Sequence, residues 1–326
     1  MNHRPVLYVI GLFLTALAKL MLLPVIYDLL TGNPDIWEFV ASAGITLLAG
    51  GLLTFSFRQA HFNIKPRQIF LLTTLCWMTL NGFAALPLWF KLPISYTDAF
   101  FETMSGITTT GSTVLAGLDT MAPSVLIWRS LLQWLGGVGF IVMAVAVLPF
   151  LKVGGMRLFQ SESSDWSEKA MPRSGSIAKR IVTVYLALTA VCAYLYFLGG
   201  MSGFEAINHA LTTVSTGGYS TSDASMAHFS NPFILWTSTV FMILASLPFV
   251  LFVRCIRGEI HCLHQDTQVQ AFIGFLLAIW GILSLWLVFH SDYSFWRALT
   301  LVAFNTTSTV TTTGYALGDY TLWGGF

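Results

Sequence analysis

Three short segments run through threonine or serine residues into a glycine, and together they could remove water from a cation. They read SGITTTGST, TTVSTGGYS and STVTTTGYA, with the shared glycine at Gly111, Gly218 and Gly314. Backbone carbonyls in such segments can replace the oxygens of an ion's hydration shell, and glycine tolerates the positive φ that this backbone requires. We therefore predict an ion-binding filter made of the residues that end each segment: Thr109, Thr110, Gly111, Thr216, Gly217, Gly218, Thr312, Thr313 and Gly314.

The three segments align without gaps, which fixes their register. A hydroxyl residue stands six positions before each glycine (Ser105, Thr212 and Ser308), and a β-branched residue stands four before it (Ile107, Val214 and Val310). Placing Gly217 in the glycine column would break the β-branched column, so Gly218 is preferred. Nine residues before the glycine stand Glu102, His209 and Asn305, which we predict to support the filter by hydrogen bonds. Plain polar packing is the alternative for these three.

The composition indicates that lipid surrounds the chain. Of its 326 residues, 55% are hydrophobic and only 10% are charged, against about 25% charged in soluble domains. The formal net charge of +1 favours no nucleic-acid partner. The four cysteines show no CxxC spacing, and we expect them to be reduced.

Seven segments are long and apolar enough to cross a bilayer, which takes about 20 residues. They are 7–30, 36–57, 68–90, 124–151, 177–199, 232–254 and 268–290. The stretches 96–110, 204–217 and 296–313, which contain the threonine–glycine segments, are too short and polar to span, so we predict that they are re-entrant. The fold expected is an all-α integral membrane protein of repeated helix, pore loop and helix units.

Basic residues accumulate in loops that stay in the cytoplasm. A cytoplasmic N-terminus leaves only Lys91 and Arg297 in external segments and places the three re-entrant stretches at the outer face. The predicted units are two leading helices (1–63), a first repeat (64–155), a second repeat (156–262) and an incomplete third repeat (263–326).

The loops resemble degenerate copies of the Thr-Val-Gly-Tyr-Gly potassium filter and are similar to the pore loops of the Trk/Ktr/HKT superfamily. The segment Trp128-Arg129 through Gln133-Trp134-Leu135-Gly136-Gly137-Val138-Gly139 resembles the helix after the first pore loop of TrkH proteins. The basic connector from Arg157 to Arg173 and the two leading helices strengthen the resemblance. Family members carry four repeats around one pore, whereas this sequence stops twelve residues after Gly314. We therefore expect a partial chain in which the fourth unit is missing.

The resemblance implies potassium uptake through a pseudo-fourfold pore in a bacterial inner membrane, and it associates glycine at Gly111 with potassium over sodium. It also implies a homodimer, surrounded by lipid, that is regulated by a cytosolic nucleotide-binding subunit of the TrkA type. No cofactor is expected. The basic connector is a predicted docking surface for that subunit.

Other functions are weighed against this one. A proton- or sodium-coupled potassium symporter is the alternative, but it would need an ionisable group deep in the membrane, and the sequence offers only Lys19. A membrane enzyme is disfavoured because catalytic motifs such as H-E-x-x-H are absent. The run Gly106 to Thr113 lacks the lysine of a nucleotide-binding loop. His261, Cys262 and His264 could bind a transition metal by type, but a polar turn is preferred.

Three remaining features are assigned structural roles. Gly136, Gly137 and Gly139 form a small-residue pattern typical of helix packing. Lys19 is expected either to extend to the interface or to pair inside the protein, with Asp28 as a partner. Arg129, about a turn inside its helix, is expected to reach interfacial water and to form a structural pair.

Overall fold

The computed structural model describes residues 3–33, 35–58, 66–151, 170–256, 258 and 261–318. Within these residues the chain is helical and contains no strand. Most of the basic connector, Asp319 and the predicted unit boundaries at 63/64 and 155/156 lie outside the described residues. The third boundary, at 262/263, falls at the start of the short helix α13 (Cys262–Gln265).

Long apolar helices form at the predicted spans. Five stretches among the described residues are long and apolar enough to cross a membrane: Arg4–Leu30, Trp37–Ser56, Phe70–Lys91, Ala178–Leu198 and Thr267–His290. They correspond to α1 (Arg4–Leu20) with α2 (Leu22–Leu30), α3 (Trp37–Ser56), α4 (Pro66–Ala84) with α5 (Leu86–Lys91), part of α9 (Ala170–Leu198), and α14 (Thr267–His290). The segment predicted at 124–151 forms α7 (Pro123–Leu151), whose 29 residues also suffice for a span.

Prolines interrupt two of the predicted spans. Pro24 cannot donate a hydrogen bond to the turn before it, and α1 gives way to α2 at Met21. The segment predicted as one span at 232–254 is instead two helices, α11 (Pro232–Ser246) and α12 (Phe249–Ile256), bent by 91°. Pro248 forces the preceding Leu247 into an extended conformation, with ψ of 151°, which ends α11.

The three stretches predicted to be re-entrant each form a short helix followed by a loop. The helices are α6 (Tyr96–Ile107), α10 (Gly203–Val214) and α15 (Phe295–Val310), which have 12, 12 and 16 residues. Ser95 and Ser202 begin α6 and α10 with capping boxes, in which a serine and an acidic residue three positions later satisfy each other's backbone amides. These helices therefore satisfy much of their own backbone without crossing the membrane.

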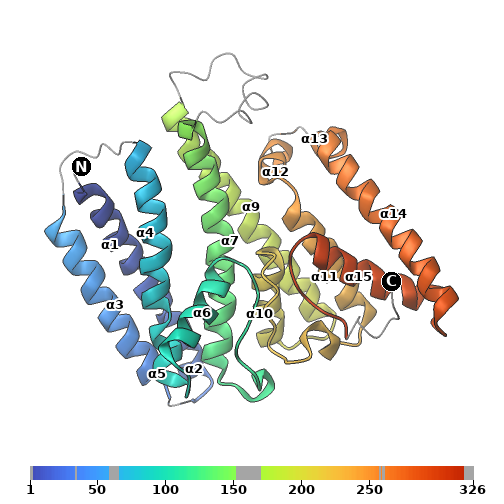
Figure 1. The fold of residues 1–326 in the computed structure, drawn as a ribbon, viewed down its shortest axis with the longest axis horizontal. Coiled ribbons are helices and arrows are strands. Elements are labelled where there is room, and N and C mark those ends of the chain that lie inside the picture. Colours follow the sequence, from blue (N-terminus) through green and yellow to red (C-terminus); the bar gives the residue numbers. More distant parts are fainter. Residues whose placement is uncertain are drawn as a thin grey trace.

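Helix α7 lies between two apolar cores (Figure 1). On one side, Trp128 is fully buried and its indole N–H donates to the carbonyl of Ala84 at 3.0 Å. On the other side, Trp134 packs against the core formed by α9 to α12 and α15. The helix that follows the first loop therefore borders the second repeat as well, which brings it into reach of the second loop.

Candidate functional site

The three loops share one backbone hydrogen-bond pattern. In each, a carbonyl near the end of the short helix accepts from the amide five residues later, at 2.9 Å, and from the amide of the glycine, at 3.3 to 3.5 Å. The accepting residues are Ser105, Thr212 and Ser308. This is the column that sequence alignment places six residues before the glycine, and it puts Gly218 rather than Gly217 in register with Gly111 and Gly314.

The loops also share two left-handed positions. The threonine two residues before each glycine has a positive φ: 56° at Thr109, 51° at Thr216 and 59° at Thr312. The glycine itself has a φ of 82°, 77° or 84°. A left-handed conformation costs a β-branched residue about 1–2 kcal/mol, and strain of this kind concentrates at functional sites. Three repetitions of the same strain indicate one structural requirement.

Consecutive loops touch through their glycines. A Cβ atom on Gly111 would overlap the carbonyl oxygen of Gly217 in the second loop, and a Cβ on Gly218 would overlap that of Thr313 in the third. Both contacts join the glycine of one loop to the residue before the glycine in the next. Among the described residues, nothing lies within 4 Å of a Cβ built on Gly314. The loops are thus related by equivalent steps.

Two tyrosines also connect consecutive repeats, in the same order as the glycine contacts. Tyr219, directly after its glycine, donates from its hydroxyl to the carbonyl of Glu102 on α6 at 2.8 Å. Tyr315, also directly after its glycine, donates to the carbonyl of His209 on α10 at 3.2 Å. Glu102 and His209 occupy the same alignment column. Each tyrosine therefore ties its own loop to the short helix of the preceding repeat.

The column nine residues before the glycine braces the strand-like segment that leaves each loop. In the first repeat, the backbone N–H of Val114 donates to Glu102 Oε2 at 2.9 Å. In the third, the N–H of Leu317 donates to Asn305 Oδ1 at 3.0 Å. In the second, His209 Nε2 lies 3.0 Å from the Ser220 hydroxyl. Each of these three side chains thus hydrogen-bonds the segment that leaves its own loop, and their role as supports of a filter stays a prediction.

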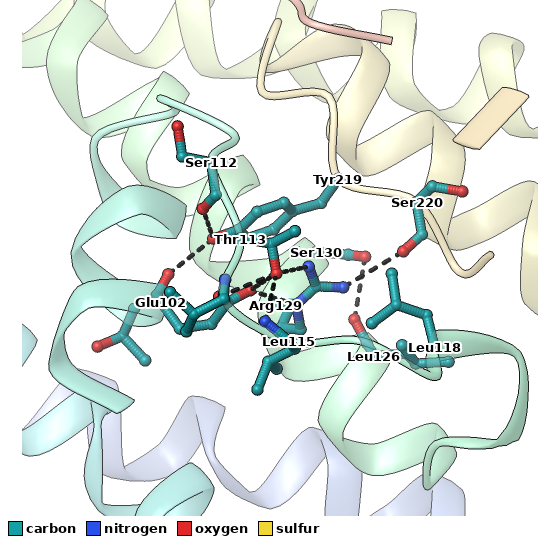
Figure 2. Close-up of polar contacts among 12 residues, drawn as sticks. Glu102, Ser112, Thr113, Leu115, Leu118, Leu126, Arg129, Ser130, Tyr219 and Ser220 are labelled. Carbon is teal, nitrogen blue, oxygen red and sulfur yellow. Dashed lines mark hydrogen bonds and ion pairs between the residues drawn. The ribbon is translucent and has the colours of Figure 1, made fainter. Parts of the chain in front are cut away.

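Glu102 also belongs to a buried charge cluster, drawn in Figure 2. Arg129 Nε donates to Glu102 Oε1 at 2.8 Å, with 2% and 0% of the two side chains exposed. The Thr113 hydroxyl donates to the same carboxylate at 2.9 and 3.0 Å. The Arg129 guanidinium lies 4.1 Å from the centre of the Tyr219 ring and donates to the carbonyl of Ser220 at 3.3 Å. The predicted structural pair is confirmed, but the predicted access of Arg129 to interfacial water is wrong, because the residue is buried.

Two contacts between the first and second repeats were not predicted from the sequence. Gln133 on α7 donates from Nε2 to the carbonyl of Gly217 at 2.6 Å and accepts at Oε1 from the N–H of Tyr219 at 3.0 Å. Asp223 accepts from the N–H groups of Gly117 and Leu118 at 2.9 and 3.1 Å. These two partners of Asp223 lie more than 100 residues away along the chain.

Helix α7 packs tightly against the start of two loops. A Cβ on Gly136 would overlap the carbonyl oxygen of Ile107, and one on Gly137 would lie 3.0 Å from the Cβ of Ser215. The predicted packing role therefore holds for these two glycines. At Gly139 nothing among the described residues lies within 4 Å of such a Cβ, so its packing role stays a prediction.

A cavity of about 350 Å³ opens beside the loops. Thr109 and Thr216, the left-handed threonines of the first two loops, contribute to its wall. Leu247 and Pro248, at the bend between α11 and α12, line it as well. The broken helix is thus next to the threonine–glycine loops rather than remote from them.

Several other predictions have definite outcomes. Lys19 is exposed, and among the described residues no ion pair joins it to Asp28, so that option is wrong. Asp28 is fully buried, and neither carboxylate oxygen has a hydrogen-bond partner within the described part of the chain. All four cysteines are free, as predicted. No group of His, Cys, Asp and Glu in the described ranges could hold a metal ion.

A family model and several known proteins match most of this chain. The family model "TrkH: Cation transport protein" matches residues 36–321. The Trk system potassium uptake protein TrkI of Halomonas elongata is 45% identical over 98% of this chain and 65% of its own length. TrkH of Vibrio parahaemolyticus is 36% identical over 97% of this chain and 68% of its own.

The shape agrees with these sequences. The crystal structure of the potassium transporter TrkH from Vibrio parahaemolyticus matches with a TM-score of 0.90 at 34% identity, over 99% of this chain and 68% of that one. This chain thus spans about two thirds of the length of the relatives it matches. The chain belongs to the TrkH family of cation transport proteins.

Proposed function

We propose that the protein takes up potassium across a bacterial inner membrane and that the threonine–glycine loops form its selectivity filter. The observation that carries this proposal is the stepwise contact of the loops, in which Gly111 meets Gly217 and Gly218 meets Thr313. Three loops with equal backbone conformation, placed by equivalent steps, present equivalent backbone atoms to one passage. The relatives from Halomonas and Vibrio are named as potassium uptake proteins.

The chemistry of the filter follows from its unused carbonyls. Within the described residues, the carbonyl groups of Thr109, Gly111 and Gly218 accept no hydrogen bond. These three residues are only half-buried, and backbone oxygens that have no donor within the protein can replace the hydration oxygens of a cation. The nine predicted filter residues (Thr109, Thr110, Gly111, Thr216, Gly217, Gly218, Thr312, Thr313 and Gly314) remain the proposed ion site.

Two of these residues contribute differently from the rest. The carbonyl of Gly217 is held by Gln133 and lies against Gly111, and that of Thr313 lies against Gly218. We assign these two carbonyls to the spacing between loops. The oxygens of the left-handed threonines and glycines are then the proposed ion ligands.

Substitution of the filter glycines tests this function. In the full-length protein reconstituted in liposomes, Gly218→Ser should abolish selective potassium flux, because the added Cβ overlaps the next loop. Gly117→Ser is the matched control, since its φ of 77° equals that of Gly218 while the nearest atom to its Cβ is 3.9 Å away. If Gly218→Ser conducted potassium as selectively as Gly117→Ser, the loops would not be the filter.

A coupled symporter is the second candidate, and Asp28 is the observation in its favour. Its carboxylate is fully buried and unpartnered among the described residues, as a group that binds a proton or sodium ion would be before loading. Glu102 offers no such site, because Arg129 and Thr113 occupy its oxygens. A symporter would accumulate potassium above its own electrochemical gradient and lose this ability in Asp28→Asn. Flux that only follows the potassium gradient would exclude coupling.

The orientation and partners are also proposals. Figure 1 shows the N-terminus, α12 and α13 at one end of the molecule. Arg4 begins α1 and Arg254 lies in α12, so the rule that basic residues stay inside supports a cytoplasmic N-terminus. From the family resemblance we also propose that the protein forms a homodimer and that a TrkA-type regulatory subunit binds at its cytoplasmic end. Cross-linking of the membrane-embedded protein tests both.

A further inference from the structure

The second loop differs from the other two at the position before its glycine. The first and third loops have a threonine there, and each threonine forms a 2.8 Å hydroxyl contact with the threonine two residues earlier: Thr110 with Thr108, and Thr313 with Thr311. The second loop has Gly217 at this position. It therefore lacks this contact between two hydroxyl side chains of the loop.

Gln133 occupies the space that this side chain would take. Its side chain is fully buried, and a Cβ on Gly217 would overlap the Gln133 carboxamide. Its hydrogen bonds to the carbonyl of Gly217 and the N–H of Tyr219 reach both sides of Gly218. Since the carbonyl can only accept and the N–H can only donate, the orientation of the amide is fixed. A residue on α7 thus replaces a residue of the loop.

Gln133 also affects the position of the first loop. The Gly217 carbonyl that Gln133 holds is the atom against which Gly111 packs. The amide therefore sets how closely the first and second loops approach each other. The corresponding oxygen of the third loop, on Thr313, packs against Gly218 without a glutamine: the described residues contribute no donor to it.

We propose that Gln133 is the specificity-determining positioning residue of this filter: it stands in for the missing threonine, fixes the spacing of the first two loops and thereby sets the preference for potassium over sodium. The inference rests on the proposed function. Filters discriminate ions through the geometry or stiffness of their oxygens, and both properties change at this site when the amide is lost.

The test removes the supporting side chain from helix α7 and restores a threonine in the loop. In liposomes containing the full-length protein, Gln133→Ala should lower the potassium-to-sodium permeability ratio by about 10-fold, the equivalent of about 1.4 kcal/mol, in the range of one to two buried hydrogen bonds. Gly217→Thr alone should not conduct, because its side chain collides with Gln133. The double variant Gln133→Ala/Gly217→Thr should recover the ratio to within about 3-fold, because the new threonine can reach Ser215 as Thr110 reaches Thr108.

Ser130→Ala is the matched control. Ser130 lies one turn earlier on α7 and is buried, and within the described residues its hydroxyl bonds to the carbonyl of Leu126 in its own helix, so its loss should leave the ratio unchanged. An unchanged ratio in Gln133→Ala, or a double variant no better than Gly217→Thr, overturns the inference. If the wild-type protein conducts potassium selectively, these results count against the role of Gln133 alone. If the wild-type protein is not selective, the proposed function itself is wrong.

Discussion

Glu102→Gln should destabilise the protein far more than the loss of one surface charge. The variant keeps a carbonyl oxygen that can accept from the Val114 N–H, but it leaves Arg129 buried beside a neutral amide. Guanidinium does not lose its proton in proteins. Removing one partner of a buried ion pair typically costs about 3–5 kcal/mol. We expect a cost in this range, because the two side chains are 0% and 2% exposed and 2.8 Å apart.

The assay is the free energy of unfolding, obtained by titrating SDS into detergent micelles and following the loss of helical circular dichroism. Glu38→Gln is the matched control. Glu38 pairs with Lys91 at 3.4 Å with 21% of its side chain exposed, and pairs in contact with water contribute about 0–1 kcal/mol. The same substitution is thus made at a fully buried pair and at one whose carboxylate reaches water, although the Lys91 side chain is only 5% exposed.

The double variant Glu102→Gln/Arg129→Met separates charge from packing. With both charges gone, the two costs should fall short of additivity by about 0.5–3 kcal/mol. Additive costs, or a cost for Glu102→Gln no larger than that for Glu38→Gln, would refute the argument that an uncompensated charge dominates.

Three further predictions follow from close contacts elsewhere. Gly50→Ala should destabilise the protein by about 1–3 kcal/mol in the same titration, because its Cβ would lie 2.8 Å from the backbone of α1, whereas Gly51→Ala, with nothing within 4 Å, should be neutral or stabilising. Copper-phenanthroline should cross-link Cys255 to Cys262, whose sulfurs lie 2.8 Å apart. The reaction should be faster at alkaline pH, because burial raises the pKa of the Cys262 thiol. A mass shift after tryptic digestion reports the cross-link. Tyr315→Phe should cost about 1–2 kcal/mol by removing hydroxyl bonds to α10, which the titration also measures.

Sequence reasoning succeeded where the signal is local. In each repeat, the aligned positions lie within nine residues of the glycine. The carbonyls of Ser105, Thr212 and Ser308 accept from the N–H groups of these glycines, in the register that the alignment gives. The long apolar runs likewise give helices close to the predicted spans. The bend near Pro248 had a local cause that the hydropathy of 232–254 concealed.

The missed side-chain contacts of the site depend on distant partners. Gln133 meets a carbonyl 84 residues away, and Arg129 meets Glu102 across 27 residues. Hydropathy treats an arginine near a helix end as interfacial, since it cannot show that a carboxylate from a re-entrant helix comes within 2.8 Å. Nothing in one sequence distinguishes a glutamine that packs from one that holds another repeat's backbone. Such contacts appear only when the repeats are assembled.

The assembled repeats keep one geometry with different chemistry behind each loop. The same alignment column holds a carboxylate in Glu102, an imidazole in His209 and an amide in Asn305, yet each contacts the segment that leaves its loop. Each loop also has a left-handed threonine, whose strain of about 1–2 kcal/mol must be offset by its surroundings. Because the left-handed threonine is common to the three loops while the supports differ, three different side chains maintain the same backbone shape. In the second loop even the side chain before the glycine has its counterpart outside the loop, in Gln133 on α7.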